Sequence, residues 1–331
     1  MRGTRVRLLA VSLAVLLVLC VLSLAIGTRF VPPNDVLPAL FGHGAGDIEA
    51  LIWGVRLPRT LLALLVGAAL GLAGAVMQAL TRNPLGDPGL LGISAGAAFG
   101  IVVAVAALGV TSLYGYLGAA FVGAAIASAV VYVLGSAGRG GATPVKLALA
   151  GVAITALLTS LTSGLTLVYP EALNRYRFWA AGSLAGQDSG VVVRALPFLL
   201  VGIVLALAMA GALNSLSLGD DVAVALGRRV RLVRVQGVVA ITLLTGVAVA
   251  VVGPIVFLGL VVPHVARAVT GPDQRWLMPF AMVLAPVLLL AADIVGRVIA
   301  RPGETEVGIV VAFVGAPFFI ALVRRRRLAE L

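Results

Sequence analysis

Two ionisable side chains within an apolar segment are the best candidates for chemistry in this sequence of 331 residues. Asp293 and Arg297 are four residues apart near the end of that segment, so in a helix they would share one face and could pair. Charged groups inside a membrane are costly and often mark ion or proton pathways, so Asp293 could instead carry protons. We favour a structural ion pair near the outer face of the membrane, and a proton relay is the alternative.

No other residues suggest catalysis or a bound group. The single cysteine, Cys20, lies within an apolar run, and the two histidines, His43 and His264, are far apart in the sequence. There is no G-x-x-x-x-G-K-[ST] phosphate loop, and the only lysine is Lys146. No nucleophile has a recognisable base beside it. We therefore expect no catalytic residue, cofactor or metal site in this chain; if ATP drives the protein, another polypeptide hydrolyses it.

Threonines form a polar stripe along the apolar run at residues 146–168. Their i, i+4, i+7, i+11 spacing puts them on one helix face, and they are Thr155, Thr159, Thr162 and Thr166. Such a face could line a water-filled path for a polar solute. Hydroxyl groups also serve as hydrogen-bond partners between membrane helices, so packing is the equal alternative.

The most distinctive segment between apolar runs lies in the loop at residues 214–235. Its sequence SLGDDVAVALG ends at Gly227, and Asp220 or Asp221 could cap a short helix there. This helix would have one apolar face, formed by Val222, Ala223 and Leu226. It could dock into a groove on a cytosolic partner or lie on the membrane surface.

The composition is that of a membrane protein: 61% of residues are hydrophobic, the mean hydropathy is +1.14 and only 11% are charged. A spanning helix needs about 20 predominantly apolar residues. Such runs lie near 8–27, 60–80, 90–108, 113–134, 146–168, 191–213, 236–258, 279–299 and 307–323. We therefore expect residues 1–331 to form a single all-α polytopic membrane domain. The first run exceeds the usual signal-peptide core of about 7–15 residues, so we take it as a membrane helix.

The net charge of +11 comes largely from arginines at the ends of apolar runs, which argues against a nucleic-acid partner. Basic residues mark the cytoplasmic side, and clusters lie at 2–7, 228–234 and 324–327. Nine spans cannot place the first and last clusters on the same side, so we expect a tenth, short span at 259–270. Both termini would then be cytoplasmic. Loops 81–89, 135–145, 214–235 and 271–278 would lie inside, and loops 28–59, 169–190 and 300–306 outside.

Glycines recur every fourth residue on both sides of the polar turn at 81–89. In lipid, small residues at this spacing let helix backbones approach and pack. We therefore expect this helical hairpin to be buried among other helices. The glycines are Gly67 and Gly71 before the turn, and Gly92, Gly96 and Gly100 after it.

Five motifs together resemble the FecCD family, the permeases of type II ABC importers for ferric siderophores, haem and vitamin B12. They extend over almost the whole chain. The motifs are RLPRTLLALLVGAALGLAGAVMQALTRNPLGDPGLLGISAGA (56–97), FWAAGSLAG (178–186), LGDDVAVALG (218–227), GPIVFLGLVVPHVARAVTG (253–271) and ADIVGRVIARPGETEVGIVVAFVGAPFFIALV (292–323). The chain departs from the family at Glu306-Val307-Gly308, where many members have E-[LI]-P-x-G.

The resemblance implies the ten-helix fold of a type II ABC importer permease and a dimer around a pathway lined partly by the fifth helices. It implies that a short helix couples the permease to an ATPase through Leu218, Gly219, Asp220, Asp221, Ala223, Leu226 and Gly227. The residues expected to receive acidic groups of a substrate-binding protein are Arg56, Arg59 and Arg297. The residues expected at a cytoplasmic gate are Asn83, Leu85 and Thr143.

We expect the membrane subunit of a binding-protein-dependent ABC importer in the bacterial cytoplasmic (inner) membrane, which moves a ferric siderophore by alternating access. The expected partners are two ATPase subunits holding ATP and Mg²⁺, a second permease copy or paralogue, an extracytoplasmic substrate-binding protein, the iron chelate and membrane lipid. Haem and cobalamin are alternative cargoes. A proton-coupled secondary transporter using Asp293, and an export-type or scaffold protein without a binding-protein partner, are the alternatives from other classes.

Overall fold

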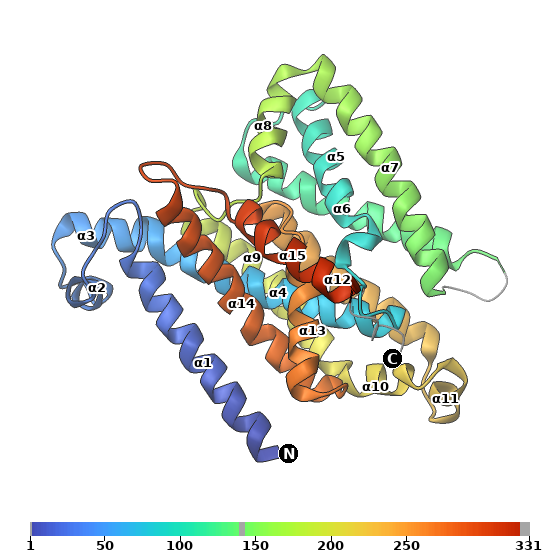
Figure 1. Cartoon of the computed structure of the whole chain (residues 1–331). Helices are drawn as coiled ribbons and strands as arrows, with labels where there is room; N and C mark the ends of the chain where they lie inside the picture. Colours follow the sequence, from blue (N-terminus) through green and yellow to red (C-terminus); the bar gives the residue numbers. More distant parts are fainter. Residues whose placement is uncertain (1, 139–142, 325–331) are drawn as a thin grey trace.

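The computed structural model describes residues 2–138 and 143–324, and that part of the chain is helical with no strands (Figure 1). The first half contains α1 (Arg2–Ala25), α2 (Pro33–Leu40), α3 (Gly46–Leu51), the π-helical turn η1 (Ile52–Arg56), α4 (Leu57–Thr81), the 3₁₀ turn η2 (Pro88–Leu91), α5 (Ile93–Ala106), α6 (Leu113–Ser136) and α7 (Pro144–Val168). The second half contains α8 (Pro170–Ala180), α9 (Ser189–Ala208), α10 (Ala210–Ser217), α11 (Asp220–Ala225), α12 (Val230–Val252), α13 (Leu258–Thr270), α14 (Gln274–Ile299) and α15 (Val307–Arg324).

Within the described residues, seven helical segments are long and apolar enough to cross a membrane, and α5, α13 and α15 are shorter apolar helices. Together they match the ten expected spans. The short span expected at 259–270 is confirmed as α13. The run at 236–258 ends early because Gly253, with φ +79°, and Pro254 terminate α12. The run at 191–213 is divided at Met209 into α9 and α10.

Side chains fix the starts of several helices. Ser112, Thr143, Asp188 and Asp273 each accept a hydrogen bond from a backbone N–H in the first turn of α6, α7, α9 and α14, respectively. These bonds satisfy donors that a helix leaves without partners at its first turn. The polar residues between apolar runs thus set where the apolar helices begin.

The core is built around α4, which packs against α9, α12, α13 and α14. The glycine rows explain how these helices come so close, which confirms the expected burial of the hairpin. A Cβ atom added at Gly74 would lie 1.8 Å from the Gly259 carbonyl oxygen of α13, so only glycine fits there. Gly71 meets the backbone of α14 in the same way. Beyond the turn, an added Cβ at Gly96 would lie 2.4 Å from the Gly123 oxygen of α6.

A second group of helices, α5 to α8, stands beside this core in Figure 1. Within the group, α7 is the outermost helix and packs on α5, α6 and α8. Its other face is open, and it carries exposed apolar side chains that include Val145, Leu149, Val152, Leu157 and Leu167. A partner helix or lipid must cover this face.

Two opposite ends of the molecule can be distinguished by the elements gathered there (Figure 1). The α3 end holds α2, α3, the end of α1 and the loop between α14 and α15. The α11 end holds α10, α11 and the start of α1. The expected outer loops 28–59 and 169–190 contain regular structure, namely α2, α3, η1 and α8. Proline in the first turn favours the starts of α2 and α8. A small apolar cluster, of which Leu24, Val31, Val36, Ala39 and Ile52 are members, holds α2 and η1 to the end of α1.

Candidate functional site

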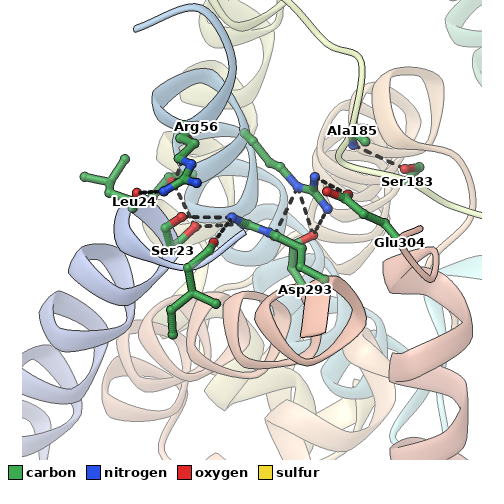
Figure 2. A network of polar contacts seen from close by, with 11 residues as sticks. Ser23, Leu24, Arg56, Ser183, Ala185, Asp293 and Glu304 are labelled. Atoms are coloured by element: carbon green, nitrogen blue, oxygen red, sulfur yellow. Dashed lines mark hydrogen bonds and ion pairs between the residues drawn. The ribbon is translucent and has the colours of Figure 1, made fainter. Parts of the chain in front are cut away.

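At the α3 end, one carboxylate is shared by two guanidinium groups (Figure 2). Arg59 donates from Nη2 to Asp293 Oδ1 at 2.8 Å and from Nε to both carboxylate oxygens. Arg297 donates from Nε to Asp293 Oδ2 at 2.9 Å and makes a second, closer contact through Nη2. Arg59, Asp293 and Arg297 are all buried. The expected structural pair between Asp293 and Arg297 is confirmed, and Arg59 is the partner that local spacing could not reveal.

Arg59 has one further partner, on the loop between α14 and α15. Its Nη1 donates to Glu304 Oε2 at 2.6 Å. The side chain of Glu304 is 29% exposed, whereas that of Asp293 is 1% exposed. The two carboxylates on Arg59 therefore differ: Asp293 is sealed within the helices, and Glu304 lies on the surface.

Arg56 and Arg297 also cap the end of α1. Arg56 donates from Nη1 to the carbonyl oxygens of Leu24 and Ala25 and from Nη2 to that of Arg29. Arg297 donates to the oxygens of Ser23 and Ile26 at 2.8 and 3.0 Å. The last carbonyl groups of a helix have no partners within it. Two elements, η1 and α14, are therefore tied to the end of α1 by these side chains.

The expected binding-protein contacts Arg56, Arg59 and Arg297 thus gather at one end, buried and hydrogen-bonded within the chain. Their contact with another protein remains a prediction. Capping of α1 is a role that sequence reasoning missed. The signal was the run of arginines near the ends of apolar segments, but only the packing of α1 against α14 shows what they contact.

At the α11 end, a second aspartate is shared by two arginines. Asp220 Oδ1 accepts from Arg82 Nη2 at 2.9 Å, and Asp220 Oδ2 accepts from Arg234 Nη2 at 2.7 Å. The expectation that Asp220 or Asp221 caps α11 was wrong, because Gly219 is the N-cap residue and no side chain caps the helix. Asp220 instead makes charge-assisted bonds to two guanidinium groups.

The helix expected at residues 218–227 is present as α11, and Gly227 follows it with φ +76°. Its apolar face is largely uncovered: Ala223 is buried, whereas Val222 and Leu226 are 44% and 58% exposed. Leu218, just before the helix, is 62% exposed. This short helix thus presents apolar side chains away from the rest of the chain.

Arg82 links α11 to the turn expected to contain the gate. It ends α4 in the left-handed conformation, with φ 49°. In the next residues, Asn83 Oδ1 accepts from the Leu85 N–H at 2.9 Å. Thr143, the third expected gate residue, accepts from the Lys146 N–H and caps α7. Among the described residues no hydrogen bond joins Thr143 to the turn.

The end of the turn, at η2, instead contacts α7 further along that helix, at Gly151. A Cβ atom added at Gly151 of α7 would lie 1.7 Å from the Leu90 carbonyl oxygen of η2, so the two backbones touch. Close by in the turn, burial raises the pKa of the Asp87 carboxyl, although the hydrogen bond from the Gly89 N–H lowers it. The second half of the turn is therefore packed into the protein, whereas Arg82 and Asn83 at its start are exposed.

The threonine stripe on α7 divides into two parts. Thr162 and Thr166 are buried and donate their hydroxyl groups to the carbonyl oxygens of Leu158 and Ser163 in their own helix. Thr159 is exposed and Thr155 is half-buried. Only part of the stripe is thus open on a single chain, and its role in a pathway remains a prediction.

The model of the FecCD transport family matches residues 15–325 of this chain. The chain belongs to the FecCD transport family. The ferric enterobactin transport system permease protein FepD of Escherichia coli (strain K12) is 49% identical to it, with 95% of this chain and 94% of that protein covered. The hemin transport system permease protein HmuU of Yersinia pestis is 38% identical, with 87% of each chain covered.

Comparison with a solved structure identifies the fold of this FecCD protein. A metal-chelate type ABC transporter in an inward-facing conformation matches with a TM-score of 0.84 and 30% identity, over 97% of this chain and 99% of that one. The chain therefore has the type II ABC importer permease fold expected from its motifs. It is a multi-pass membrane permease of the ABC importer class and not itself an enzyme.

Proposed function

We propose that this FecCD protein moves a ferric siderophore across the bacterial cytoplasmic membrane, driven by ATP hydrolysis on two separate ATPase subunits. The choice of a ferric siderophore as the cargo rests on the 49% identity over nearly full length with a ferric enterobactin permease. A second copy or paralogue would cover the open face of α7 and complete the pathway beside Thr155 and Thr159.

In this proposal the α11 end faces the cytoplasm and the α3 end faces outward. The supporting observation is the distribution of basic residues, since Arg5, Arg7, Arg228, Arg229 and Arg231 are all near the α11 end. The exposed apolar side chains of Leu218, Val222 and Leu226 would then fit a groove on the ATPase. The turn with Asn83 and Leu85, together with Thr143, would form the inner gate.

Haem is the second candidate cargo, because a hemin permease is 38% identical over 87% of its length. A proton-coupled transporter is less well supported. Asp293 is enclosed by Arg59 and Arg297. Protonation would remove the negative charge that both buried guanidinium groups face and would leave only Arg59 with a carboxylate, that of Glu304, which is strongly unfavourable.

The test is reconstitution of the permease with its ATPase in nanodiscs and measurement of ATP hydrolysis with candidate binding proteins. Stimulation by a binding protein loaded with a ferric siderophore, and not by the same protein empty, is the expected result. Stimulation only by a haem-loaded binding protein would replace siderophore with haem. Uptake into vesicles that needs a proton gradient and no ATPase would overturn the proposal.

A further inference from the structure

Of the three arginines expected to contact a binding protein, only Arg59 has a partner that can be exchanged. We propose that Glu304 occupies on Arg59 the position that a carboxylate of the docking binding protein takes, so that the Glu304 side chain acts as a displaceable latch over this site. The inference rests on the proposed function, because it concerns regulation of the same docking surface.

Arg56 and Arg297 are not free to meet a partner protein. Each donates to at least two carbonyl oxygens at the end of α1, and Arg297 also pairs with Asp293. Removing either guanidinium group from these bonds would take hydrogen-bond donors away from buried carbonyl groups, which is unfavourable. Their contacts thus hold the helices together.

Arg59 presents a different arrangement. Its Nε and Nη2 atoms face the buried Asp293, whereas Nη1 faces the loop and Glu304. If Glu304 turns away, Arg59 keeps its bonds to Asp293 and the Glu304 carboxylate enters water. The exchange therefore exposes one side of a guanidinium group and leaves the core contacts in place (Figure 2).

The loop is fastened on both sides of Glu304, so a rotation of its side chain is sufficient. Before it, Arg301 Nη2 donates to the Gly27 oxygen at 2.8 Å, and after it, the Thr305 N–H donates to the Gly296 oxygen at 3.0 Å. Neither bond involves the Glu304 side chain. The latch can open without unfolding the loop.

Charge explains why a carboxylate should replace Glu304. Arg59 and Arg297 share the single charge of Asp293, so without Glu304 this cluster carries one excess positive charge. A positive group in partly desolvated surroundings attracts an acidic side chain more strongly than one in water. The cluster thus requires a second carboxylate, supplied by the chain itself before docking and by the partner afterwards.

The test measures the Kd between the transporter in nanodiscs and the loaded binding protein that gives the greatest ATPase stimulation in the experiment above. At low ionic strength, Glu304→Gln should lower Kd by about three- to tenfold, because an internal competitor is removed. Arg59→Gln should raise Kd by about tenfold or more. The matched control is Asp47→Asn at the same end, where an exposed carboxylate pairs with the exposed Arg29 at 3.0 Å. It changes the net charge equally and should leave Kd nearly unchanged.

The outcomes separate the latch from the docking role. If Glu304→Gln leaves Kd unchanged or raises it while Arg59→Gln weakens binding, the latch is wrong and docking on Arg59 stands. If Asp47→Asn lowers Kd as much as Glu304→Gln, net charge explains the effect and the latch is again wrong. If Arg59→Gln has no effect, neither the latch nor the docking role that the family resemblance implies for Arg59 holds.

Discussion

The two ends of the molecule use the same arrangement, one aspartate between two arginines, at very different depths. At the α3 end, the side chains of Asp293, Arg59 and Arg297 are 1%, 8% and 2% exposed. At the α11 end, those of Asp220 and Arg82 are both 38% exposed, and only Arg234 is nearly buried, at 11%. The two clusters contain the same residue types at similar distances, so they differ in how far their side chains are exposed to solvent.

This difference in burial gives the clusters different uses. Breaking a buried pair leaves an uncompensated charge and costs about 3–5 kcal/mol, whereas an exposed pair contributes about 0–1 kcal/mol. The cluster of Asp293 therefore fixes the positions of α1, α4 and α14. The cluster of Asp220 can open and re-form at little cost, which would suit the coupling of α11 to an ATPase that we propose.

The largest effect is expected for Asp293→Asn. Loss of the charge leaves Arg297 with its hydrogen bonds to Ser23 and Ile26 and leaves Arg59 with Glu304, and the free energy of unfolding should fall by about 3–5 kcal/mol. Thermal unfolding of the purified protein in detergent, together with the yield of folded protein, measures this. Asp47→Asn is the control and should behave like the wild type. A wild-type unfolding midpoint for Asp293→Asn would contradict the contrast between the two ends.

A smaller loss of stability is expected for Arg56→Gln, which removes the donors to the end of α1. The cost should be about 1–3 kcal/mol, since buried carbonyl groups lose their partners. The single cysteine, Cys20, lies within α1 and provides a native reporter. Its labelling by N-ethylmaleimide should accelerate as α1 loosens. Arg29→Gln, which alters an exposed arginine, is the control, and equal labelling rates in both variants would refute the capping role.

For Asp220→Asn, stability should change by no more than about 1 kcal/mol, but coupling should suffer. Substrate transported per ATP hydrolysed should fall about fivefold, which corresponds to a coupling free energy of about 1 kcal/mol. Asp221→Asn is the matched control, because Asp221 makes no ion pair within the described part of the chain. Equal losses in both variants would show that α11 needs acidic side chains for the ATPase and not for Arg82.

The smallest effect concerns pH at the α11 end. Burial raises the pKa of Asp273, but hydrogen bonds from Asn214 Nδ2, at 2.6 Å, and from the Arg275 N–H bring it below its ordinary value. Since the folded-state pKa is the lower one, the carboxylate stabilises the protein above its unfolded pKa of about 3.9, and this stability is lost as the pH falls through the folded value.

Asn214→Ala should therefore lower the unfolding midpoint at neutral pH, by about 1 kcal/mol in free energy, and should lower it less in acid. Unfolding curves of both proteins across the acidic range measure this. A difference between them that grows as the pH falls would show that the sign is wrong.

Sequence patterns predicted the features that depend on near neighbours or on total hydropathy. The spans, the short helix α13, the packing role of the glycine rows and the pair between Asp293 and Arg297 are all of this kind. The spacing of residues along the sequence and the composition are enough to predict these features, because the geometry of a helix depends on near neighbours.

Partners that are distant in the sequence could not be predicted in this way. Arg59 and Asp293 are 234 residues apart, and Arg82 and Asp220 are 138 apart. Asp220 satisfies every local rule for a helix cap, yet the fold brings two arginines to it. The scarcity of acidic residues, 13 against 24 lysines and arginines, was a usable signal, because each acidic side chain has several candidate partners.

The contact between Gly151 and Leu90 has a mechanical consequence. Two backbones in direct contact leave no slack, so neither side-chain rotation nor compression can absorb a displacement between η2 and α7. A push on Arg82 that moves the turn should therefore reach α7 undiminished. A bulkier residue at position 151 would act as a spacer that holds α7 away from the turn at a fixed distance, whatever the state of an ATPase partner.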